Sequence, residues 1–265
     1  MKLCEGEPIL RQEAGRPSKS KDAYLRFFSR KHAIRYRSDA FSDRIKIAIS
    51  QTIVTADGKI IYIKNPKAGC SSVAHLLYQY DNHHFYEGDI HHAPSLQVTD
   101  RWKSVVDIPE DTVSFSTVRN PERRSVSAFF NFFIEKNNPE HPEHLDRMEL
   151  LGFSKKADNH YKFDVFLAYI EANFEYSVLK TDGHFRPQHI NIGHGAVELS
   201  YISRLETLDA DLKHISERVG VILSDLSKLS KGMSNQSSSG DFVPSATQKR
   251  QIEALYKKDY ELYGY

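Results

Sequence analysis

The chain has 265 residues, of which 40% are hydrophobic and 27% are charged, and its formal net charge at pH 7 is +1. This length suits one α/β domain with a full hydrophobic core, and the composition is that of an ordinary soluble protein. A net charge so close to zero argues against a general nucleic-acid binder or a membrane-surface binder. Any anion site must therefore be a local arrangement of residues.

Cysteine usage and the lack of long apolar runs indicate the compartment. The two cysteines, Cys4 and Cys70, lie far apart and offer neither a disulfide framework nor a zinc-ligand spacing. No apolar run approaches the roughly 20 residues that cross a bilayer. Residues 1–21 contain no apolar signal-peptide region. We therefore expect a cytoplasmic protein without a transmembrane segment.

The N-terminal residues 1–50 are predicted to be a polar, basic extension that ends in the first strand. Within it, residues 22–34 are predicted to be a helix, and the basic side chains favour a solvated face over contact with an acidic acceptor. The alternation of apolar and polar residues from 45 to 54 predicts a strand. The sequence ADGK at residues 56–59 predicts a hairpin turn early in the main domain, which we place at residues 51–265.

The stretch from residue 60 to 80 is predicted to be a strand, a tight loop and a helix. Residues 60–63 (IIYI) are a β-branched and aromatic run typical of a buried strand, which the Asn65-Pro66 pair ends. Ser71 and Ser72 are placed to cap the helix that follows. Backbone N–H groups and the helix dipole make such a turn a natural anion site. A polar turn before an amphipathic helix is the simpler alternative.

Four histidines follow the predicted helix, in the segment NHHFYEGDIHH. No Cys, Asp or Glu stands at a familiar ligand spacing, so surface histidines and a catalytic base are considered alongside a metal site. His83 and His84 come directly after the helix and are expected to be exposed. His91 and His92 follow a strand-like segment, residues 84–90, from which a side chain can face a ligand.

A second strand and helix are predicted in the segment VSFSTVRNPERRSVSAFFNFF. Residues 113–118 have strand composition, an Asn-Pro pair breaks the strand, and residues 122–133 carry apolar side chains on one helical stripe. Arg119 closes the strand, and Arg123 and Arg124 occupy the first turn of the helix. Cations at a helix N-terminus oppose the helix dipole, so this pair indicates a bound anion.

Together these segments resemble the carbohydrate sulfotransferases, that is, sulfotransferase family 2 of the Golgi type and its bacterial relatives. The pattern P-K-x-x-x-S-S at residues 66–72 resembles their loop for the 5′-phosphosulfate of 3′-phosphoadenosine 5′-phosphosulfate (PAPS). The pattern R-N-P-x-x-R-x-x-S-x-F at residues 119–129 is similar to their 3′-phosphate motif. HFRPQ at residues 184–188 and the C-terminal residues 256–265 are similar to two further family segments. The resemblance covers about residues 55–265.

The resemblance implies a role for each of these residues. Lys67 would contact the phosphosulfate and its bridging oxygen. Arg119 and Ser127 would hold the 3′-phosphate, with Arg123 or Arg124 in support. On the acceptor side we expect His184 and Arg186. The loop amides, two serines and one residue of the Ser/Asn-rich loop 231–237 would complete the donor site: Ala68, Gly69, Cys70, Ser71, Ser72 and Asn235.

The implied reaction transfers a sulfuryl group from PAPS to a hydroxyl of a carbohydrate or glycan-like acceptor and leaves adenosine 3′,5′-bisphosphate (PAP). The leaving group is a phosphate, so no metal is required in principle and none is expected. For the base that takes the acceptor proton, the resemblance favours His91 over His92, and His184 is a third candidate. The sequence identifies neither the acceptor nor the oligomeric state, and no nucleic-acid partner is expected.

Two alternative functions stay open at this point. One is a non-catalytic nucleotide-binding module that keeps both phosphate motifs. The other is a P-loop kinase-like phosphotransferase that uses ATP, although Lys67 stands too early for the pattern G-x-x-x-x-G-K-[ST].

The remaining elements complete the predicted fold. Residues 176–180 (YSVLK) are predicted to be a third strand, and amphipathic helices are predicted at 163–173, 206–219 and 245–260. Residues 135–160 are interpreted as a polar insertion that helps to cover the acceptor site. Alternating strands and helices predict a single α/β domain with a P-loop-like, mostly parallel sheet flanked by helices. The ligand should lie beyond the carboxyl ends of the strands.

Overall fold

The computed structural model describes residues 2–3, 41–93, 111–135, 142–221, 223 and 241–265. Among these residues, four strands form the central sheet in the order β2-β3-β4-β6. β2 pairs antiparallel with β3, whereas β3 pairs parallel with β4 and β4 pairs parallel with β6. The predicted α/β class with a mostly parallel sheet is therefore confirmed. The strand bounds are Thr52–Val54 for β2, Ile60–Ile63 for β3, Val113–Val118 for β4 and Tyr201–Arg204 for β6.

The two strands that precede the phosphate motifs lie side by side in the middle of this sheet. Every residue of β3 and of β4 is buried, which explains the apolar run IIYI of β3, while β4 (VSFSTV) alternates apolar residues with small hydroxyl residues. Ile60 pairs with Val113 and Ile63 pairs with Ser116, so the two strands end at the same edge. The predicted hairpin turn at residues 56–59 is confirmed, because β2 and β3 pair antiparallel on either side of it.

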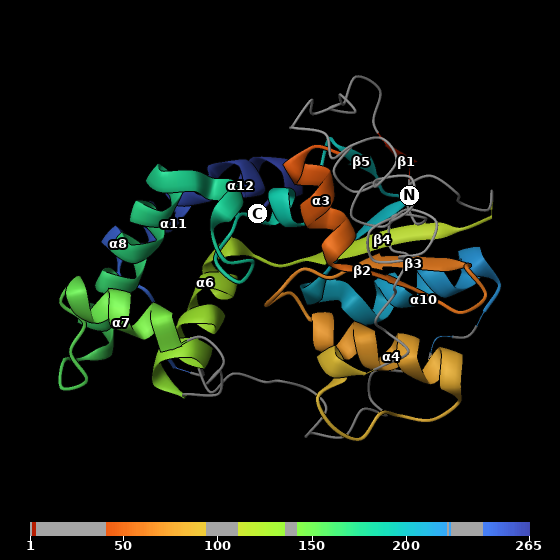
Figure 1. Ribbon diagram of the computed structural model, residues 1–265, viewed down its shortest axis with the longest axis horizontal. Coiled ribbons are helices and arrows are strands. Elements are labelled where there is room, and N and C mark those ends of the chain that lie inside the picture. Colours follow the sequence, from red (N-terminus) through yellow and green to blue (C-terminus); the bar gives the residue numbers. More distant parts are fainter. Residues whose placement is uncertain (1, 4–40, 94–110, 136–141, 222, 224–240) are drawn as a thin grey trace, which may run out of the picture.

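Helices cover both faces of the sheet (Figure 1). On one face, α4 (Cys70–Asn82) and α10 (Leu208–Val219) pack against side chains such as Tyr62 and Phe115. On the other face, α3 (Asp43–Ser50) packs against Ile61 and Ile63. Next to it, the short strand β5 (Val197–Glu198) pairs antiparallel with β1 (Lys2–Leu3).

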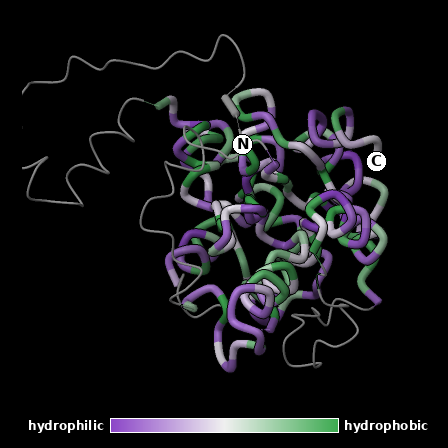
Figure 2. The backbone as a smooth tube through the Cα atoms, turned by 90° about the vertical axis from the view of Figure 1, so that its right-hand side faces the viewer, coloured by the Kyte–Doolittle hydropathy of each residue, from purple (hydrophilic) through white to green (hydrophobic). Residues whose placement is uncertain are grey.

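A second group of helices lies beside the sheet, at the left of Figure 1. Its core is a cluster of aromatic rings centred on Phe129, which contacts Phe163 and Phe166 at centroid distances of 5.1 and 5.6 Å. Hydrophobic and hydrophilic residues are interspersed along the chain (Figure 2), as expected where helices bury one face. The helices are α6 (Pro121–Phe129), α7 (Pro142–Leu150), α8 (Asn159–Ser177), α11 (Ala246–Leu255) and α12 (Lys257–Tyr263).

The predicted helices are confirmed with adjusted bounds. The helix after residue 120 is α6, and a π-helical turn, Phe130–Ile134, extends it. The helices predicted at 163–173 and 206–219 lie within α8 and largely within α10, and the one at 245–260 is divided into α11 and α12. The insertion at 135–160 contains α7 in its described part. The helix predicted at residues 22–34 lies outside the described residues.

The strand predicted at residues 45–54 is wrong, because most of this segment is helix α3 and only its end is strand β2. The side chain of Ser42 accepts a hydrogen bond from the backbone N–H of Ile45 and so begins the helix. Ile45, Ala48 and Ile49 then share one buried helical face. The spacing of the apolar residues fits both the two-residue period of a strand and the 3.6-residue period of a helix, and the N-cap Ser42 favours the helix.

The strand predicted at residues 176–180 is also wrong. Helix α8 continues to Ser177, and a 3-10 turn, Val178–Lys180, follows it. Helix propagation adds one hydrogen bond per residue, so a long helix overrides a short β-prone run at its end. The third strand of the parallel part is β6 instead. The strand-like segment 84–90 is also no strand, because it consists of bends and irregular backbone that lead into the 3-10 turn beginning at Ile90.

In the part of the chain that the structure describes, no helix is both long enough and apolar enough to cross a membrane.

The glycine before α4 provides a test of how tightly the loop is packed. Gly69 has φ +80°, and a Cβ built there lies 2.7 Å from Cδ1 of Leu205. Gly220 has a similar φ of +68° but no atom within 4 Å of such a Cβ. Both alanine variants should lose about 1 kcal/mol from the positive φ. Gly69→Ala should lose more than Gly220→Ala, because the side chain of Leu205 must move to relieve the overlap, as measured by denaturant unfolding. Equal losses would contradict this packing.

Candidate active site

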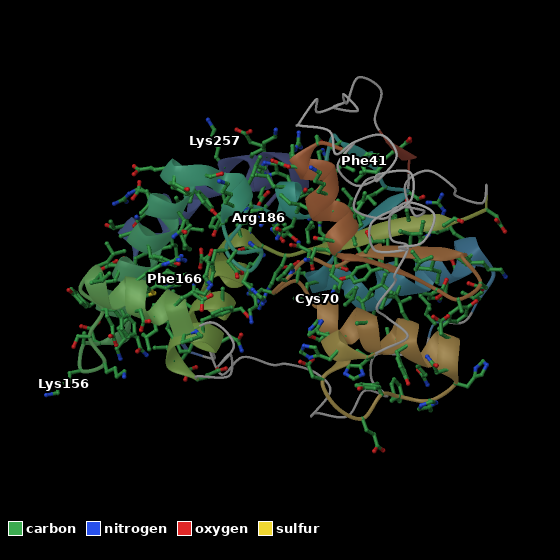
Figure 3. All side chains as sticks on the ribbon, in the orientation of Figure 1. Phe41, Cys70, Lys156, Phe166, Arg186 and Lys257 are labelled. Carbon is green, nitrogen blue, oxygen red and sulfur yellow. The ribbon has the colours of Figure 1, made fainter. Side chains whose placement is uncertain are left out.

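The loop between β3 and α4 leads directly into a helix N-terminus. Helix α4 begins at Cys70, and its N-cap, Gly69, makes no side-chain capping hydrogen bond. The prediction that Ser71 and Ser72 cap the helix is therefore wrong: both serines lie in its first turn. The amide donors of this turn stay available together with the positive end of the helix dipole, which favours an anion. Figure 3 shows Cys70 at this end of α4, where the sheet meets the helical group.

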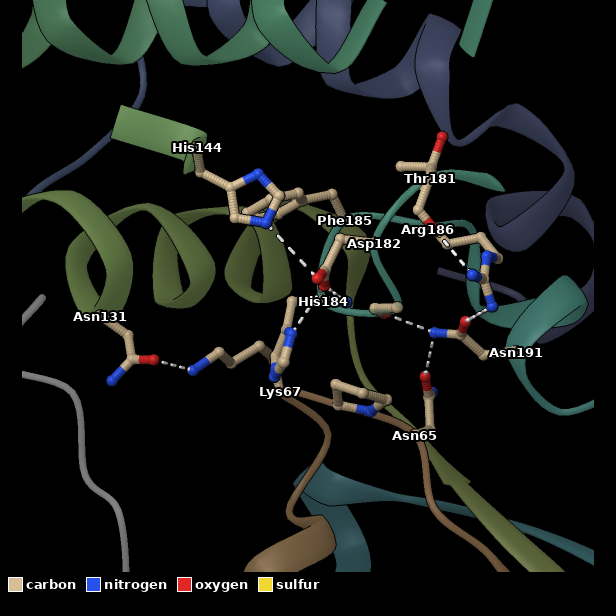
Figure 4. Close-up of polar contacts among 12 residues, drawn as sticks. Asn65, Lys67, Asn131, His144, Thr181, Asp182, His184, Phe185, Arg186 and Asn191 are labelled. Carbon is tan, nitrogen blue, oxygen red and sulfur yellow. Dashed lines mark hydrogen bonds and ion pairs between the residues drawn. The ribbon is translucent and has the colours of Figure 1, made fainter. Parts of the chain in front are cut away.

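Lys67 has a backbone conformation that only a well-supported loop maintains. Its φ is +66°, which is unusual for a residue with a side chain. Its Nζ donates a hydrogen bond to the side-chain amide oxygen of Asn131 and lies 5.4 Å from the ring centroid of Phe132 (Figure 4). Both partners lie in the π-helical turn, and such turns often occur at functional sites.

Burial lowers the pKa of Lys67 to about 8, and the positive charges of Arg124 and Arg119 act in the same direction. Cys70 and Glu135 act against the shift but do not cancel it. The ammonium group is therefore held in a place where a further negative charge is electrostatically favourable. An anionic ligand beside Lys67 would supply that charge.

Gln188 joins the ends of the two central strands. Its side-chain oxygen accepts hydrogen bonds from Nδ2 of Asn65 at 3.0 Å and from the backbone N of Arg119 at 2.9 Å. Its Nε2 donates to the carbonyl oxygen of Arg119 at 2.7 Å. Buried Asp259 in turn accepts the backbone N–H of Gln188 at 2.7 Å. One amide group therefore fixes the start of the Lys67 loop against the end of β4.

Arg119, the first residue of the motif at residues 119–129, contacts the loop motif at residues 66–72. Its Nη1 donates a hydrogen bond to the carbonyl oxygen of Lys67 at 3.2 Å. Burial lowers its pKa, and the charges of Arg123 and Arg124 lower it further, against the opposing charge of Glu206. Arg119 is therefore close to both the loop before α4 and the first turn of α6, as the predicted donor site requires.

The two arginines at the start of α6 have different surroundings. Arg124 is buried, and its guanidinium donates to the carbonyl oxygens of Pro66, Arg186 and Gly183 at 2.9, 3.0 and 2.9 Å. It therefore holds two loops together, so the prediction that it supports a phosphate is corrected in favour of this structural role. Arg123 is exposed, and it lies one turn from buried Ser127 on the same helix.

The structure separates the two neighbouring histidines, His91 and His92. Both belong to the 3-10 turn Ile90–His92, and Asp89 accepts the backbone N–H of His91. The Nε2 atom of His91 lies 2.8 Å from Oγ of Ser71, at the first turn of α4. His92 is exposed and pairs with Asp89 at 3.0 Å. His91 therefore reaches the loop and His92 does not.

The charge at this end of α4 also affects the thiol. Burial alone would raise the pKa of Cys70, but the hydrogen bond and charge of His91, with Lys64 and Lys67, lower it overall. Ala68 is completely buried between these residues. The role predicted for residues 68–70, which is to bind the donor through their backbone amides, stays a prediction. Asn235, the other predicted donor-site residue, lies outside the described residues.

A histidine and carboxylate cluster lies on the other side of Lys67 (Figure 4). Nδ1 of His184 is 2.7 Å from Oδ1 of Asp182, and Nε2 of His144 is 3.4 Å from Oδ2 of the same carboxylate. Nδ1 of His144 is 2.7 Å from the hydroxyl of Tyr169. His83 and His84 are exposed, as predicted.

Arg186, predicted to contact the acceptor, is bound to its own segment. Its Nη2 donates to the carbonyl oxygen of Thr181 at 2.6 Å, and its Nη1 donates to the side chain of Asn191 at 3.3 Å. These contacts shape the loop that carries His184, and a role in binding the acceptor stays a prediction.

Sequence reasoning missed four residues that organise this site. The asparagines make long-range contacts that no local pattern indicates. Asp182 stands two residues before His184, and that spacing was a signal available in the sequence. The four residues are Asn65, Asn131, Asp182 and Gln188. In the described ranges, no group of three or more His, Cys, Asp or Glu side chains is arranged to hold a metal ion.

Comparison with known proteins gives one finding for this arrangement. The family model described as the sulfotransferase family matches residues 50–265. That range contains the loop before α4, the first turns of α6 and the cluster around Asp182. No curated protein and no solved structure gives a significant match to the chain.

The lowered pKa of Lys67 leads to a prediction about proton uptake. At about pH 8.5 the free protein should hold Lys67 mostly as the neutral amine, and a bound bisphosphate should restore the ammonium form. Binding of PAP at that pH should therefore take up protons. Calorimetry in two buffers with different ionisation enthalpies measures this uptake. It should decrease strongly in Lys67→Met, and an unchanged uptake in that variant would show that another group is responsible.

Proposed function

Because the chain belongs to the sulfotransferase family, we propose that it transfers a sulfuryl group from PAPS to a hydroxyl of a carbohydrate or glycan-like acceptor. The observation that carries this proposal is the direct contact between the two phosphate motifs. Nη1 of Arg119 donates a hydrogen bond to the backbone carbonyl of Lys67. This bond holds together the lysine proposed for the 5′-phosphosulfate and the arginine proposed for the 3′-phosphate. A nucleotide with phosphates at both its 5′ and 3′ positions suits such a pair.

The donor side would use backbone amides and two kinds of cation. The N–H groups at the start of α4, with Ser71 and Ser72, would bind the 5′-phosphate. Arg119 and Ser127, with exposed Arg123 nearby, would bind the 3′-phosphate through charge-assisted hydrogen bonds. Within the described residues, Arg119 makes one such contact with the protein, to the carbonyl oxygen of Lys67, whereas Arg124 makes three contacts with carbonyl oxygens of the fold.

The transfer would depend on positioning and on electrostatic stabilisation. The acceptor oxygen and the leaving oxygen lie in line across the sulfur, and charge develops on the leaving phosphate as the bond breaks. Lys67 is placed at the loop where that charge would appear. Its conformation and its contacts with Asn131 and Phe132 hold the ammonium group before the donor binds.

The acceptor class rests on the family resemblance, since fold alone does not identify a substrate. A small hydroxylated metabolite would use the same chemistry. A non-catalytic nucleotide-binding module is the second candidate, and it would bind PAP without transferring sulfate. A kinase-like protein would prefer ATP. The cytoplasmic location expected from the sequence stays a prediction.

Selectivity for PAP tests the assignment of the 3′-phosphate site. PAP should bind much more tightly than AMP or ATP, because only PAP and PAPS carry the 3′-phosphate. Arg119→Ala should weaken PAP binding by roughly 1.5–3 kcal/mol, the cost of losing a charge-assisted hydrogen bond, with little effect on AMP. Exposed Arg250 on α11 provides the matched control, Arg250→Ala. If calorimetry finds equal affinity for AMP and PAP, the assignment of Arg119 and Ser127 is wrong.

Removal of the lysine tests catalysis separately from binding. With saturating donor, Lys67→Ala should abolish sulfuryl transfer while PAP affinity falls only moderately, because charge on the leaving oxygen develops fully only in the transition state. The assay follows label from sulfur-35 PAPS into a panel of unsulfated glycosaminoglycans and simple sugars. Lys257→Ala, on the exposed face of α12, is the control. Near-normal turnover in Lys67→Ala would rule out a catalytic role for Lys67.

A further inference from the structure

The loop that carries His184 is fixed against the loop that carries Lys67. The guanidinium of Arg124 donates to carbonyl oxygens on both sides, to Pro66 on one loop and to Gly183 on the other. A Cβ built on Gly183 would lie 3.7 Å from Cγ of Pro66, so a methyl group would fill the space between the two loops. The relative position of His184 and Lys67 is therefore set by the fold and does not depend on a ligand.

The same aromatic ring supports both side chains. Nζ of Lys67 lies 5.4 Å from the ring centroid of Phe132, and the imidazole of His184 lies 4.9 Å from that centroid. The close-up shows the imidazole beside the lysine side chain (Figure 4). Because Lys67 is assigned to the bridging oxygen of the donor, His184 lies next to the sulfuryl group that a bound donor would present.

The partner of His184 fixes which ring nitrogen carries the proton. Oδ1 of Asp182 accepts the backbone N–H of His184 at 2.8 Å and lies 2.7 Å from its Nδ1. Burial alone would raise the pKa of Asp182, but hydrogen bonds from His144 and His184 hold it far below the usual range. An ionised carboxylate only accepts, so Nδ1 carries the hydrogen and Nε2 carries the lone pair.

The charge state of His184 suits the same role. Burial lowers the pKa of His184, and the positive charges of Lys67 and Arg124 lower it further, against the opposing effect of Asp182. His144 of α7 is a further titratable residue here, and its Nε2 faces the carboxylate of Asp182. The imidazole is therefore neutral near pH 7 and has a lone pair to accept a proton.

The histidine that the sequence favoured as the base is held differently. Nε2 of His91 lies 2.8 Å from the hydroxyl of Ser71, in the first turn of α4. That turn is assigned to the 5′-phosphate, so His91 lies on the nucleotide side of the donor. In contrast, His184 lies beside the side chain of Lys67 (Figure 4), and the ring of Phe132 contacts both.

From this geometry we propose that His184, oriented by Asp182, is the base that takes the proton from the acceptor hydroxyl. The inference rests on the proposed sulfuryl transfer. The acceptor oxygen forms a bond to sulfur, and the bond from sulfur to the bridging oxygen breaks. The electron pair of that bond goes to the 5′-phosphate of PAP, and the hydroxyl proton goes to Nε2 of His184. Asp182 is a positioning residue, which His144 and Tyr169 hold in place from α7 and α8.

A nearby pair provides a matched control. Nδ1 of His189 lies 2.7 Å from Oδ1 of Asp259, the same distance as in the His184 pair, but its carboxylate serves to anchor α9 (Gln188–Asn191). His184→Gln should lower the transfer rate by about 10²–10⁴-fold, the usual contribution of a general base, and leave PAP affinity and the melting temperature nearly unchanged. His189→Gln should keep wild-type transfer per folded molecule. His91→Ala is measured alongside, and a larger rate loss there than in His184→Gln would overturn the proposal.

A second readout requires no acceptor. Nitrogen-15 NMR of the wild-type protein with bound PAP should show His184 as the neutral tautomer with hydrogen on Nδ1, identified by the signal that His184→Gln removes. Asp182→Asn should change this tautomer and lower the rate, and added imidazole should partly restore transfer in His184→Gly. A protonated His184 near pH 7, or hydrogen on its Nε2, would overturn the proposal. A wild-type protein that does not bind PAP would instead contradict the proposed function.

Discussion

The buried guanidinium of Arg124 is the interaction on which the rest of the site depends. An enclosed cation is costly unless every donor finds a partner. Here three of its nitrogens donate to three backbone carbonyl oxygens, those of Pro66, Gly183 and Arg186. These carbonyls belong to the loops that carry Lys67 and His184. Loops usually move easily, but Arg124 joins these two. Its buried charge is stabilised only while its hydrogen bonds to both loops persist.

A second consequence is the concentration of positive charge at one edge of the sheet. Burial lowers the pKa values of Lys67 and Arg119, and each also experiences the charge of neighbouring arginines. The carboxylate of Glu206 opposes the lowering of the pKa of Arg119, and that of Asp182 opposes the lowering of the pKa of nearby Arg186. A site that holds cations together at such electrostatic cost is arranged for an anion. We propose that the amides at the start of α4 and the side chains at the start of α6 bind one common anion.

Local patterns were reliable where one element dominates its own neighbourhood. The runs at 60–63 and 113–118 are buried on both faces of the sheet, so composition alone identified them as strands. The strand predicted at residues 45–54 was wrong because the apolar spacing was ambiguous and a capping serine begins a helix there. The strand predicted at 176–180 was wrong because helix α8 continues into this β-prone segment. Arg124 belongs to the motif that resembles a phosphate site, yet burial gave it another role, since a motif does not report what surrounds a side chain.

By itself, the sequence determined the α/β class and the two strand–loop–helix units. Parallel strands place their carboxyl ends together, so the sequence also predicted the sheet edge at which a ligand should lie. Only the tertiary structure decided that β6 completes the parallel part and that Gln188 joins the two loops. It also decided that Asp182 and His184 lie against Lys67. Those contacts join segments that are distant in the chain, and they depend on side-chain direction and packing, which local periodicity does not encode.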